Sequence, residues 1–156
     1  MNVLVTGATS LIGRHTVDAL VREGHHVSTL QRGDVSGVPT IPDRSAVEQA
    51  CAGQDAVIHL AAKVGVTGIW REYEHTNVHG TALLIDVARH AGVTRFVHVS
   101  SPSVAHSGSA LVGVGAAAAD PTTTRGHYAT SKAAAEVVAL DASTAEFPVT
   151  AIRPHL

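Results

Sequence analysis

Short apolar runs alternate along this chain with longer stretches in which apolar residues recur every three or four positions. The apolar runs, which are typical of buried strands, fall at residues 2–6, 26–31, 38–41, 56–61, 95–99 and 148–152. The periodic stretches, which are typical of amphipathic helices, fall at residues 12–23, 45–52, 72–90 and 127–142. This alternation predicts an α/β fold, a doubly wound parallel sheet of Rossmann type with right-handed crossovers and helices on both faces.

Turn and capping residues support these boundaries. Gly24 follows the first helical stretch, where glycine commonly ends a helix. Ser45 and Glu48 have the spacing of a capping box, which predicts that the second helix begins at Ser45. Residues 108–124 are rich in glycine, alanine, proline and threonine without a period, and we expect a long loop there. Because no repeat or linker interrupts the pattern, we interpret residues 1–156 as a single domain.

Composition and charge exclude several classes of function. The net charge is -2 and no cluster of lysine and arginine forms a stripe, so we expect no nucleic-acid partner. No apolar run reaches the roughly 18 residues of a membrane span, and the N-terminus shows no secretory pattern. Cys51, the single cysteine, cannot build a disulfide framework and is expected to be a small packed residue. We therefore expect a cytoplasmic protein.

The eleven histidines raise the question of a metal site. They are scattered, with no H-E-x-x-H motif and no partnering cysteine cluster. The closest pair, His75 and His79, lies four residues apart on an expected helix and could chelate in principle. Two surface or satisfied histidines are the simpler interpretation. We predict no metal.

A glycine-rich turn follows the first strand directly. Residues 6–13 read T-G-A-T-S-L-I-G and open the first helix. A helix that begins at such a turn offers free N–H groups and the positive end of its dipole to a pyrophosphate. Gly7 permits the tight turn, and Gly13 lets the helix pack close to the strand. The arrangement predicts a dinucleotide-binding turn.

Three side chains are candidates for acid–base chemistry. Tyr128 and Lys132 lie four residues apart, and hence on one face of a helix. A nearby ammonium stabilises a tyrosinate, which makes Tyr128 a usable general acid or base for a carbonyl/alcohol pair. Ser101 follows the strand at residues 95–99, at the strand end where open α/β sheets place their sites. Ser101 is the candidate hydrogen-bond donor to the substrate oxygen, with Ser100 as the alternative.

These motifs resemble those of the extended short-chain dehydrogenase/reductase superfamily, which includes NAD(P)-dependent epimerases and dehydratases. Residues 6–13 are similar to its T-G-x-x-G-x-x-G fingerprint, and residues 96–102 to the strand that ends in its catalytic serine. Residues 55–62 resemble the strand whose end runs along the cofactor. Residues 77–81 resemble the N-V-x-G-T motif, whose asparagine ties its helix to the neighbouring strand. The sequence V-S-S-P-S-V-A-H at residues 99–106 favours the 3β-hydroxysteroid dehydrogenase-like branch.

The resemblance implies hydride transfer between NAD(P)H and a carbonyl or alcohol of a small substrate, sugar-nucleotide- or steroid-like. Its catalytic set would be Ser101, Tyr128 and Lys132, with Lys132 also holding the nicotinamide ribose. The residues implied to contact the cofactor are Gly7, Thr9, Ser10, Leu11, Ile12, Gly13, Arg32, Asp43, Leu60, Ala61, Ala62, Tyr128, Lys132 and Pro154.

The chain departs from the family pattern in the cofactor region. Ser10 replaces the middle glycine of the fingerprint, and its Cβ would cost about 1 kcal/mol if φ were positive, although its hydroxyl can donate to a phosphate. Gln31 and Arg32 stand where NAD-preferring members carry an acidic residue, so the cofactor is NADP or NAD with NADP favoured. Asp43 either stands in for the family aspartate near adenine or simply precedes a helix.

A further departure concerns the substrate side. Residues 152–156 resemble the segment at which the family chain crosses into its smaller substrate domain, and that domain is essentially absent from this sequence. Three functions therefore stay open. They are an NAD(P)-dependent oxidoreductase or epimerase, a non-catalytic dinucleotide-binding module, and a truncated, inactive relative. An apolar face exposed where the missing domain would pack favours a homodimer.

Overall fold

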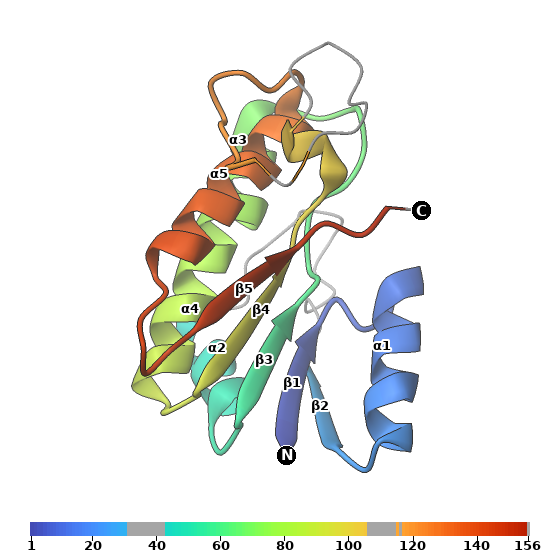
Figure 1. The fold of residues 1–156 in the computed structure, drawn as a ribbon, viewed down its shortest axis with the longest axis vertical. Coiled ribbons are helices and arrows are strands. Elements are labelled where there is room, and N and C mark those ends of the chain that lie inside the picture. The colour runs from blue at the N-terminus through green and yellow to red at the C-terminus, as the bar shows by residue number, and fades with distance from the viewer. Residues whose placement is uncertain (31–42, 106–114, 116, 156) are drawn as a thin grey trace.

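A single parallel sheet organises the computed structural model, which describes residues 1–30, 43–105, 115 and 117–155 (Figure 1). Its strands within these ranges lie in the order β2-β1-β3-β4-β5. They are β1 (Asn2–Thr6), β2 (His26–Leu30), β3 (Ala56–His59), β4 (Arg95–Val99) and β5 (Val149–Ile152). The chain leaves β1 toward β2 and then returns to the other side of β1, so the winding reverses between β1 and β3. Ligands bind at such a switch point in open α/β sheets.

Helices cover both faces of the sheet, as the alternating pattern predicts. Helix α1 (Leu11–Arg22) lies on one face (Figure 1). On the other face lie α2 (Arg44–Cys51), α4 (Gly80–His90) and α5 (His127–Asp141). The fold is therefore Rossmann-type. The expected strand at residues 38–41 and the expected contact residue Arg32 lie outside the described residues.

The core forms two layers because side chains alternate along each strand. On one side, Leu4, Val57 and Phe96 pack against α2, α4 and α5. On the other side, Val3 and Val5 pack with apolar residues of α1. Cys51 is free and fully buried in the first layer, as expected of a packed residue, and burial raises the pKa of its thiol to about 11.

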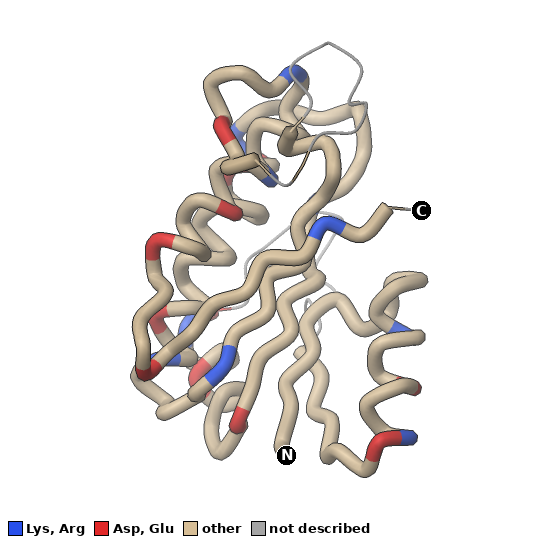
Figure 2. Tube along the Cα trace, viewed as in Figure 1, with Lys and Arg blue, Asp and Glu red and all other residues tan. Residues whose placement is uncertain are grey.

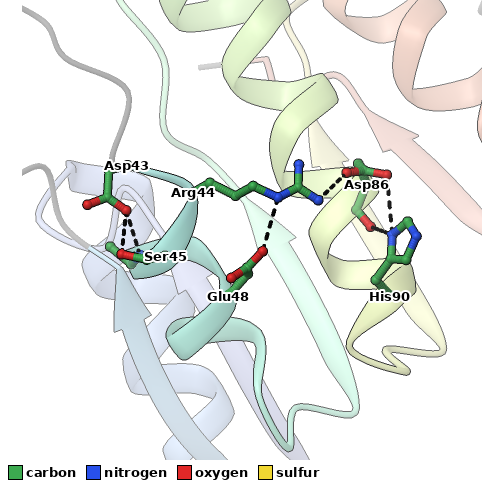
Figure 3. A network of polar contacts seen from close by, with 7 residues as sticks. Asp43, Arg44, Ser45, Glu48, Asp86 and His90 are labelled. Carbon is green, nitrogen blue, oxygen red and sulfur yellow. Dashed lines mark hydrogen bonds and ion pairs between the residues drawn. The ribbon is translucent and has the colours of Figure 1, made fainter.

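The start of α2 differs from the predicted capping box. Asp43, not Ser45, is the N-cap: its carboxylate accepts a hydrogen bond from the Ala46 N–H at 3.1 Å and another from the Ser45 hydroxyl at 2.6 Å (Figure 3). The Ser45 hydroxyl bond, with the two backbone N–H groups, holds the pKa of Asp43 below its ordinary value. A carboxylate is favoured here over a hydroxyl because its charge also meets the positive end of the helix dipole.

Arg44 links α2 to α4 across the surface. Its guanidinium donates to Glu48 at 3.0 Å and to Asp86 at 2.7 Å, and Asp86 also contacts His90 at 3.2 Å (Figure 3). Glu48, predicted to complete the capping box, therefore pairs with Arg44 instead. These pairs are exposed and therefore screened by solvent, so the network links the two helices without adding much stability.

The helix predicted over residues 72–90 is divided into three parts. A short α3 (Trp70–Tyr73) leads into a π-helical turn, η1 (Glu74–His79), which continues as α4. The Thr81 hydroxyl donates to the Asn77 carbonyl at 2.6 Å and competes for the acceptor that an α-helix would use. Wider turns of this kind are frequent at functional sites. Within η1, the rings of His75 and His79 lie 6.2 Å apart, edge to face.

Basic and acidic residues are spread over the described trace, with no run of one sign along any described element (Figure 2). Across residues 1–30, 43–105 and 117–155, no helix has the length and apolar character needed to span a bilayer.

Candidate functional site

Two glycines hold the turn between β1 and α1 close to neighbouring backbone. Gly7 adopts φ 70°, and a Cβ there would lie 2.8 Å from the Ala61 nitrogen. A Cβ on Gly13 would lie 2.8 Å from the Cα of Ala8. Both glycines are therefore required by the backbone, as the sequence predicts. The first-turn N–H groups of Leu11 and Ile12 have no intrahelical acceptor, which suits an anionic ligand.

Ser10 fits this turn without strain. Its φ is -67° and its ψ 165°, so the cost expected for a positive φ does not arise. Its hydroxyl caps α1 by accepting a hydrogen bond from the Gly13 N–H at 3.0 Å and donating one to the Gly7 carbonyl at 2.8 Å. The replacement of the family glycine therefore strengthens the helix start. The same hydroxyl hydrogen is engaged with Gly7, so the proposed compensating bond to a phosphate is not needed to explain the residue.

An open pocket of about 550 Å³ lies at the carboxyl edge of the sheet, between this turn and α5. Of the residues predicted from sequence, it is lined by Ser10, Leu11, Ile12, Leu60, Ala62, Ser101, Tyr128, Lys132 and Pro154. The further lining residues are Val64, Val99, Ser100, Pro102, Ser103 and His155. The fold therefore brings the glycine-rich turn and the three candidate catalytic side chains to one cavity.

Other predicted contact residues lie outside the pocket lining. Gly7 and Gly13 shape the turn from behind, while Thr9 and Ala61 are neighbours of lining residues. Asp43 caps α2, and its expected position beside adenine stays a prediction.

The packing of α5 against the sheet places Lys132 in the buried part of the pocket wall. Alanines such as Ala129 and Ala133 on the buried face of the helix are small enough for α5 to lie close to the sheet. The Lys132 amine donates to the Val99 carbonyl at 2.7 Å, and the side chain is 3% exposed. Burial lowers the pKa of Lys132 to about 8, although the Glu136 carboxylate opposes this shift. Tyr128, one turn earlier on the same helix face, is half-buried at the pocket wall.

The two candidate serines differ in their surroundings. Ser101 is half-buried, and its hydroxyl lies 2.9 Å from that of Ser103 and accepts from the Ser103 N–H at 3.2 Å. Ser100 is 6% exposed, and its N–H donates to the Ile152 carbonyl at 2.7 Å. Both residues line the pocket, but Ser101 presents the more accessible hydroxyl.

Asn77 ties three segments together below the site. Its amide accepts from the Lys63 N–H at 2.7 Å and donates to the Lys63 carbonyl at 3.1 Å. It also donates to the Ser131 hydroxyl at 2.9 Å. Asn77 therefore ties its helix to the segment that follows β3, and not to the strand itself as the resemblance implies. The tie extends to α5, immediately before Lys132.

Sequence reasoning missed two buried histidines. His59 and His98 are register partners on adjacent strands, with ring centroids 5.7 Å apart. Both His59 nitrogens have partners, the hydroxyls of Thr6 at 2.7 Å and Thr81 at 3.0 Å. Burial lowers the pKa of His59 to about 3 and that of His98 to about 2, with the Lys132 charge acting in the same direction. The sequence did contain an indication of their burial, since each histidine stands within an otherwise apolar strand.

A second buried polar contact fixes the end of β5 to α5. Arg153 donates to the two Glu136 carboxylate oxygens, at 3.0 Å from Nε and 2.5 Å from Nη2. Glu136 is 1% exposed. Burial alone would raise the pKa of Glu136, but the Arg153 hydrogen bonds hold it below the ordinary value.

Within the described ranges, no three histidine, cysteine, aspartate or glutamate side chains gather as a metal site would require. The site instead combines a parallel sheet that reverses its winding at β1, a glycine turn at a helix N-terminus, and a pocket at the carboxyl strand ends. These features define a Rossmann-type nucleotide-binding domain.

The family follows from comparison with known proteins. Residues 3–156 match the NAD dependent epimerase/dehydratase family, and the chain belongs to it. The predicted resemblance to the extended short-chain dehydrogenases is thereby confirmed.

Curated relatives include reductases of ketones. The chain is 37% identical to the 2-alkyl-3-oxoalkanoate reductase of Stenotrophomonas maltophilia (strain K279a), covering 100% of this chain and 51% of the relative. It is 30% identical to the 4-hydroxy-2-methyl-3-oxo-4-farnesyl-3,4-dihydroquinoline-1-oxide ketoreductase of Stigmatella aurantiaca, covering 99% and 50%. The chain thus spans about half the length of the curated relatives it matches.

Solved structures agree on the fold. MoeE5, in complex with UDP-glucose and NAD, superimposes with a TM-score of 0.79 at 32% identity, over 98% of this chain and 54% of that one. A short-chain dehydrogenase/reductase superfamily protein from Agrobacterium tumefaciens with bound NAD gives a TM-score of 0.83 at 27% identity, over 98% and 48%.

Proposed function

We propose that this chain is an NAD(P)-dependent oxidoreductase domain that transfers hydride between the cofactor and a carbonyl or alcohol carbon. The observation that carries the proposal is the shared pocket. Ser101, Tyr128 and the buried Lys132 line the same cavity as the first turn of α1. Reduction of a carbonyl requires that the acid–base group and the bound cofactor both reach the substrate. A cavity lined by the candidate acid–base residues and by the glycine-rich turn's helix meets this requirement.

The residues present fit a dinucleotide. The first turn of α1 lines the pocket through Leu11 and Ile12, whose backbone N–H groups have no acceptor within the helix. The N-terminus of α1 would hold the pyrophosphate, and Leu60 and Ala62 would lie along the cofactor. When bound, the nicotinamide supplies the hydride. NADP is the favoured form, because Arg32 rather than an acidic residue follows the second strand.

Each candidate catalytic residue has a distinct task in this proposal. Tyr128 would donate a proton to the substrate oxygen in the reducing direction and take it back in the oxidising direction. Ser101 would donate a hydrogen bond to the same oxygen and orient the carbonyl. Lys132, with its amine beneath the pocket, would stabilise the tyrosinate left after proton transfer. The acid–base step therefore needs only side chains of α5 and of the β4 end.

For the substrate we propose a ketone that carries an alkyl chain, such as a 2-alkyl-3-oxoalkanoate, rather than a sugar nucleotide. Val64 is 70% exposed and lines the pocket. Val66 and Ile69, which follow it in the same segment, are also exposed. The Tyr73 hydroxyl holds this segment, since its single hydrogen is shared between the Thr67 carbonyl at 2.7 Å and the Gly65 carbonyl at 3.0 Å. An alkyl chain would cover these side chains. The names of the two ketone-reducing relatives support the same substrate class.

A non-catalytic dinucleotide-binding module is the second candidate. It is favoured by the exposed apolar side chains of Val64, Val66 and Ile69, which are suited to contact with another protein. In that case the cofactor would bind without turnover, and a second copy or another protein would cover the apolar side chains near the pocket.

Fluorescence titration with NADPH and NADH tests cofactor binding first. We expect saturable binding of at least one of them, with NADPH the tighter. Oxidation of the bound cofactor is then followed at 340 nm with a 2-alkyl-3-oxoalkanoate, a 3-ketosteroid and a UDP-sugar. The ketones are expected to react, and Tyr128→Phe is expected to abolish turnover while binding persists. Thr94→Val is the control, because it removes an exposed hydroxyl that lies outside the pocket lining.

The outcomes separate the candidates. Binding without turnover on any substrate would favour the module, and turnover retained by Tyr128→Phe would contradict the assigned acid. Binding of neither cofactor would exclude both functions and leave an inactive relative. A faster reaction with the UDP-sugar would overturn the proposed substrate class alone.

A further inference from the structure

His98 has surroundings that a purely structural histidine would not need. It is fully buried on the sheet face that carries α5, between His59 and Lys132. Its Nε2 lies 3.5 Å from the Lys132 amine. Its Nδ1 has no hydrogen-bond partner among the described residues. A phenylalanine would fill this volume without an unpaired buried nitrogen, so packing alone does not account for the imidazole.

The hydrogen-bonding capacity of a neutral imidazole restricts how His98 and Lys132 can meet. One ring nitrogen is a donor and the other an acceptor, and an ammonium has three donors and no acceptor. If Lys132 is charged, His98 Nε2 must accept, and the ring proton sits on Nδ1. If His98 carries its proton on Nε2, Lys132 must be a neutral amine that accepts it. The protonation state of the amine and the tautomer of the ring are therefore linked.

We propose that His98 is a positioning residue for Lys132, a second anchor that, with the Val99 carbonyl, holds the amine under the pocket and supports its charged form. The Val99 carbonyl accepts one amine hydrogen at 2.7 Å, and His98 Nε2 is placed to accept a second. The third hydrogen then remains for the site. His59 cannot substitute, because both of its nitrogens are already bonded to threonine hydroxyls.

Among the described residues, the charged and titratable groups around the Lys132 amine come from β3, β4 and α5. From β3 comes His59 and from β4 His98, both kept neutral by burial. From α5 come Tyr128, one turn before Lys132 on the same face, and Glu136, whose charge favours the ammonium but is itself paired with Arg153. Removing the His98 acceptor leaves the amine with desolvation and one carbonyl, so its affinity for the proton must fall. That Lys132 serves a reaction rests on the proposed function, whereas the His98–Lys132 contact does not.

The chain makes a direct measurement possible because it contains only two lysines, Lys63 and Lys132. Protein labelled with 13C at lysine Cε gives two NMR signals, and Lys63→Arg assigns them. The titration midpoint of the Lys132 signal is then measured, without cofactor or substrate, in wild type, His98→Phe and His98→Gln. We expect His98→Phe to lower the midpoint by about one pH unit, a tenfold loss of proton affinity. His98→Gln keeps an acceptor and is expected to restore most of it.

An unchanged midpoint in both variants would overturn the inference, as would equal shifts in both. If His98→Phe does not fold, His98→Leu replaces it, and the comparison with His98→Gln stands. A second measurement separates this inference from the proposed function: the pH dependence of NAD(P)H oxidation with the ketone. A shifted midpoint without any turnover would support the His98 anchor and contradict the enzymatic proposal. Turnover whose pH profile follows the shifted midpoint would support both.

Discussion

The two buried histidines predict that the protein loses stability in mild acid. Both are neutral in the folded chain because burial lowers the pKa of His59 to about 3 and that of His98 to about 2. In the unfolded chain each would titrate near its ordinary value of about 6.5. Between these limits the unfolded state binds more protons than the folded state. Stability is therefore fully present above pH 6.5 and is lost as the pH falls.

The size of the effect follows from the number of protons. Each histidine that is neutral when folded and charged when unfolded contributes a slope of about 1.4 kcal/mol per pH unit. From pH 7 to pH 5 the loss is about 2 kcal/mol for each, and about 4 kcal/mol for His59 and His98 together. A domain of this kind is stable by roughly 5–15 kcal/mol, so this loss is a large fraction. The carboxyl groups with lowered pKa values, such as Glu136, titrate below this window.

Urea unfolding at pH 7, 6 and 5, followed by the fluorescence of Trp70 and by circular dichroism, measures the loss. With a denaturant slope of about 2 kcal/mol/M, the midpoint should fall by about 2 M. His98→Phe removes one of the two groups and should halve the pH dependence, whereas His15→Gln, at an exposed position of α1, should leave it unchanged. A loss below about 1 kcal/mol in wild type, or the full loss in His98→Phe, would refute the reasoning.

Three further predictions follow from the glycine turn and the buried polar contacts. Gly13→Ala would place a Cβ 2.8 Å from Ala8 and should weaken NADPH binding at least about tenfold in fluorescence titration, with about 1–3 kcal/mol lost in urea unfolding. Asn77→Leu leaves the Lys63 backbone without its partners and should cost about 2–4 kcal/mol in the same unfolding assay. Arg153→Met leaves the Glu136 carboxylate buried and unpaired, and calorimetry should show a loss of about 3–5 kcal/mol, part of which Glu136→Gln restores in the double variant.

The fold could be predicted from the sequence because its signals are local. Apolar runs of strand length and periodic helical stretches each report the burial of one element, and glycine turns mark their ends. The pocket followed from the same logic. The glycine turn after β1 and the hydroxyls after β4 both lie at carboxyl strand ends, and parallel strands bring those ends together. Tyr128 and Lys132 were recognised because four residues span one helical turn.

The sequence was less informative about local hydrogen bonding, because a pattern of residue types does not show which donor and acceptor will pair. Ser45 matched the capping box, but Asp43, two residues earlier, has the stronger acceptor and takes the N-cap position. The π-helical turn of η1 changes the backbone hydrogen bonding within a continuous helical stretch, which the period of apolar positions does not indicate. The sequence does not indicate the role of His98, because its contact with Lys132 joins residues 34 positions apart that only the fold brings together.

Helix α5 explains why these polar contacts matter to the site as well as to stability. Its buried face is largely alanine, including Ala133, Ala135 and Ala139, which permits close approach but provides little shape to fix rotation or sliding. Polar contacts from three other segments fix the rotation and position of the helix instead. Asn77 of η1 bonds to Ser131, and Arg153 after β5 bonds to Glu136. Val99 and His98 of β4 contact Lys132. Because Tyr128 and Lys132 stand on this same helix, the contacts that set its register also set where the two side chains lie. A variant such as Arg153→Met should therefore disturb the Lys132 titration as well as the melting temperature, although Arg153 is not among the residues that line the pocket.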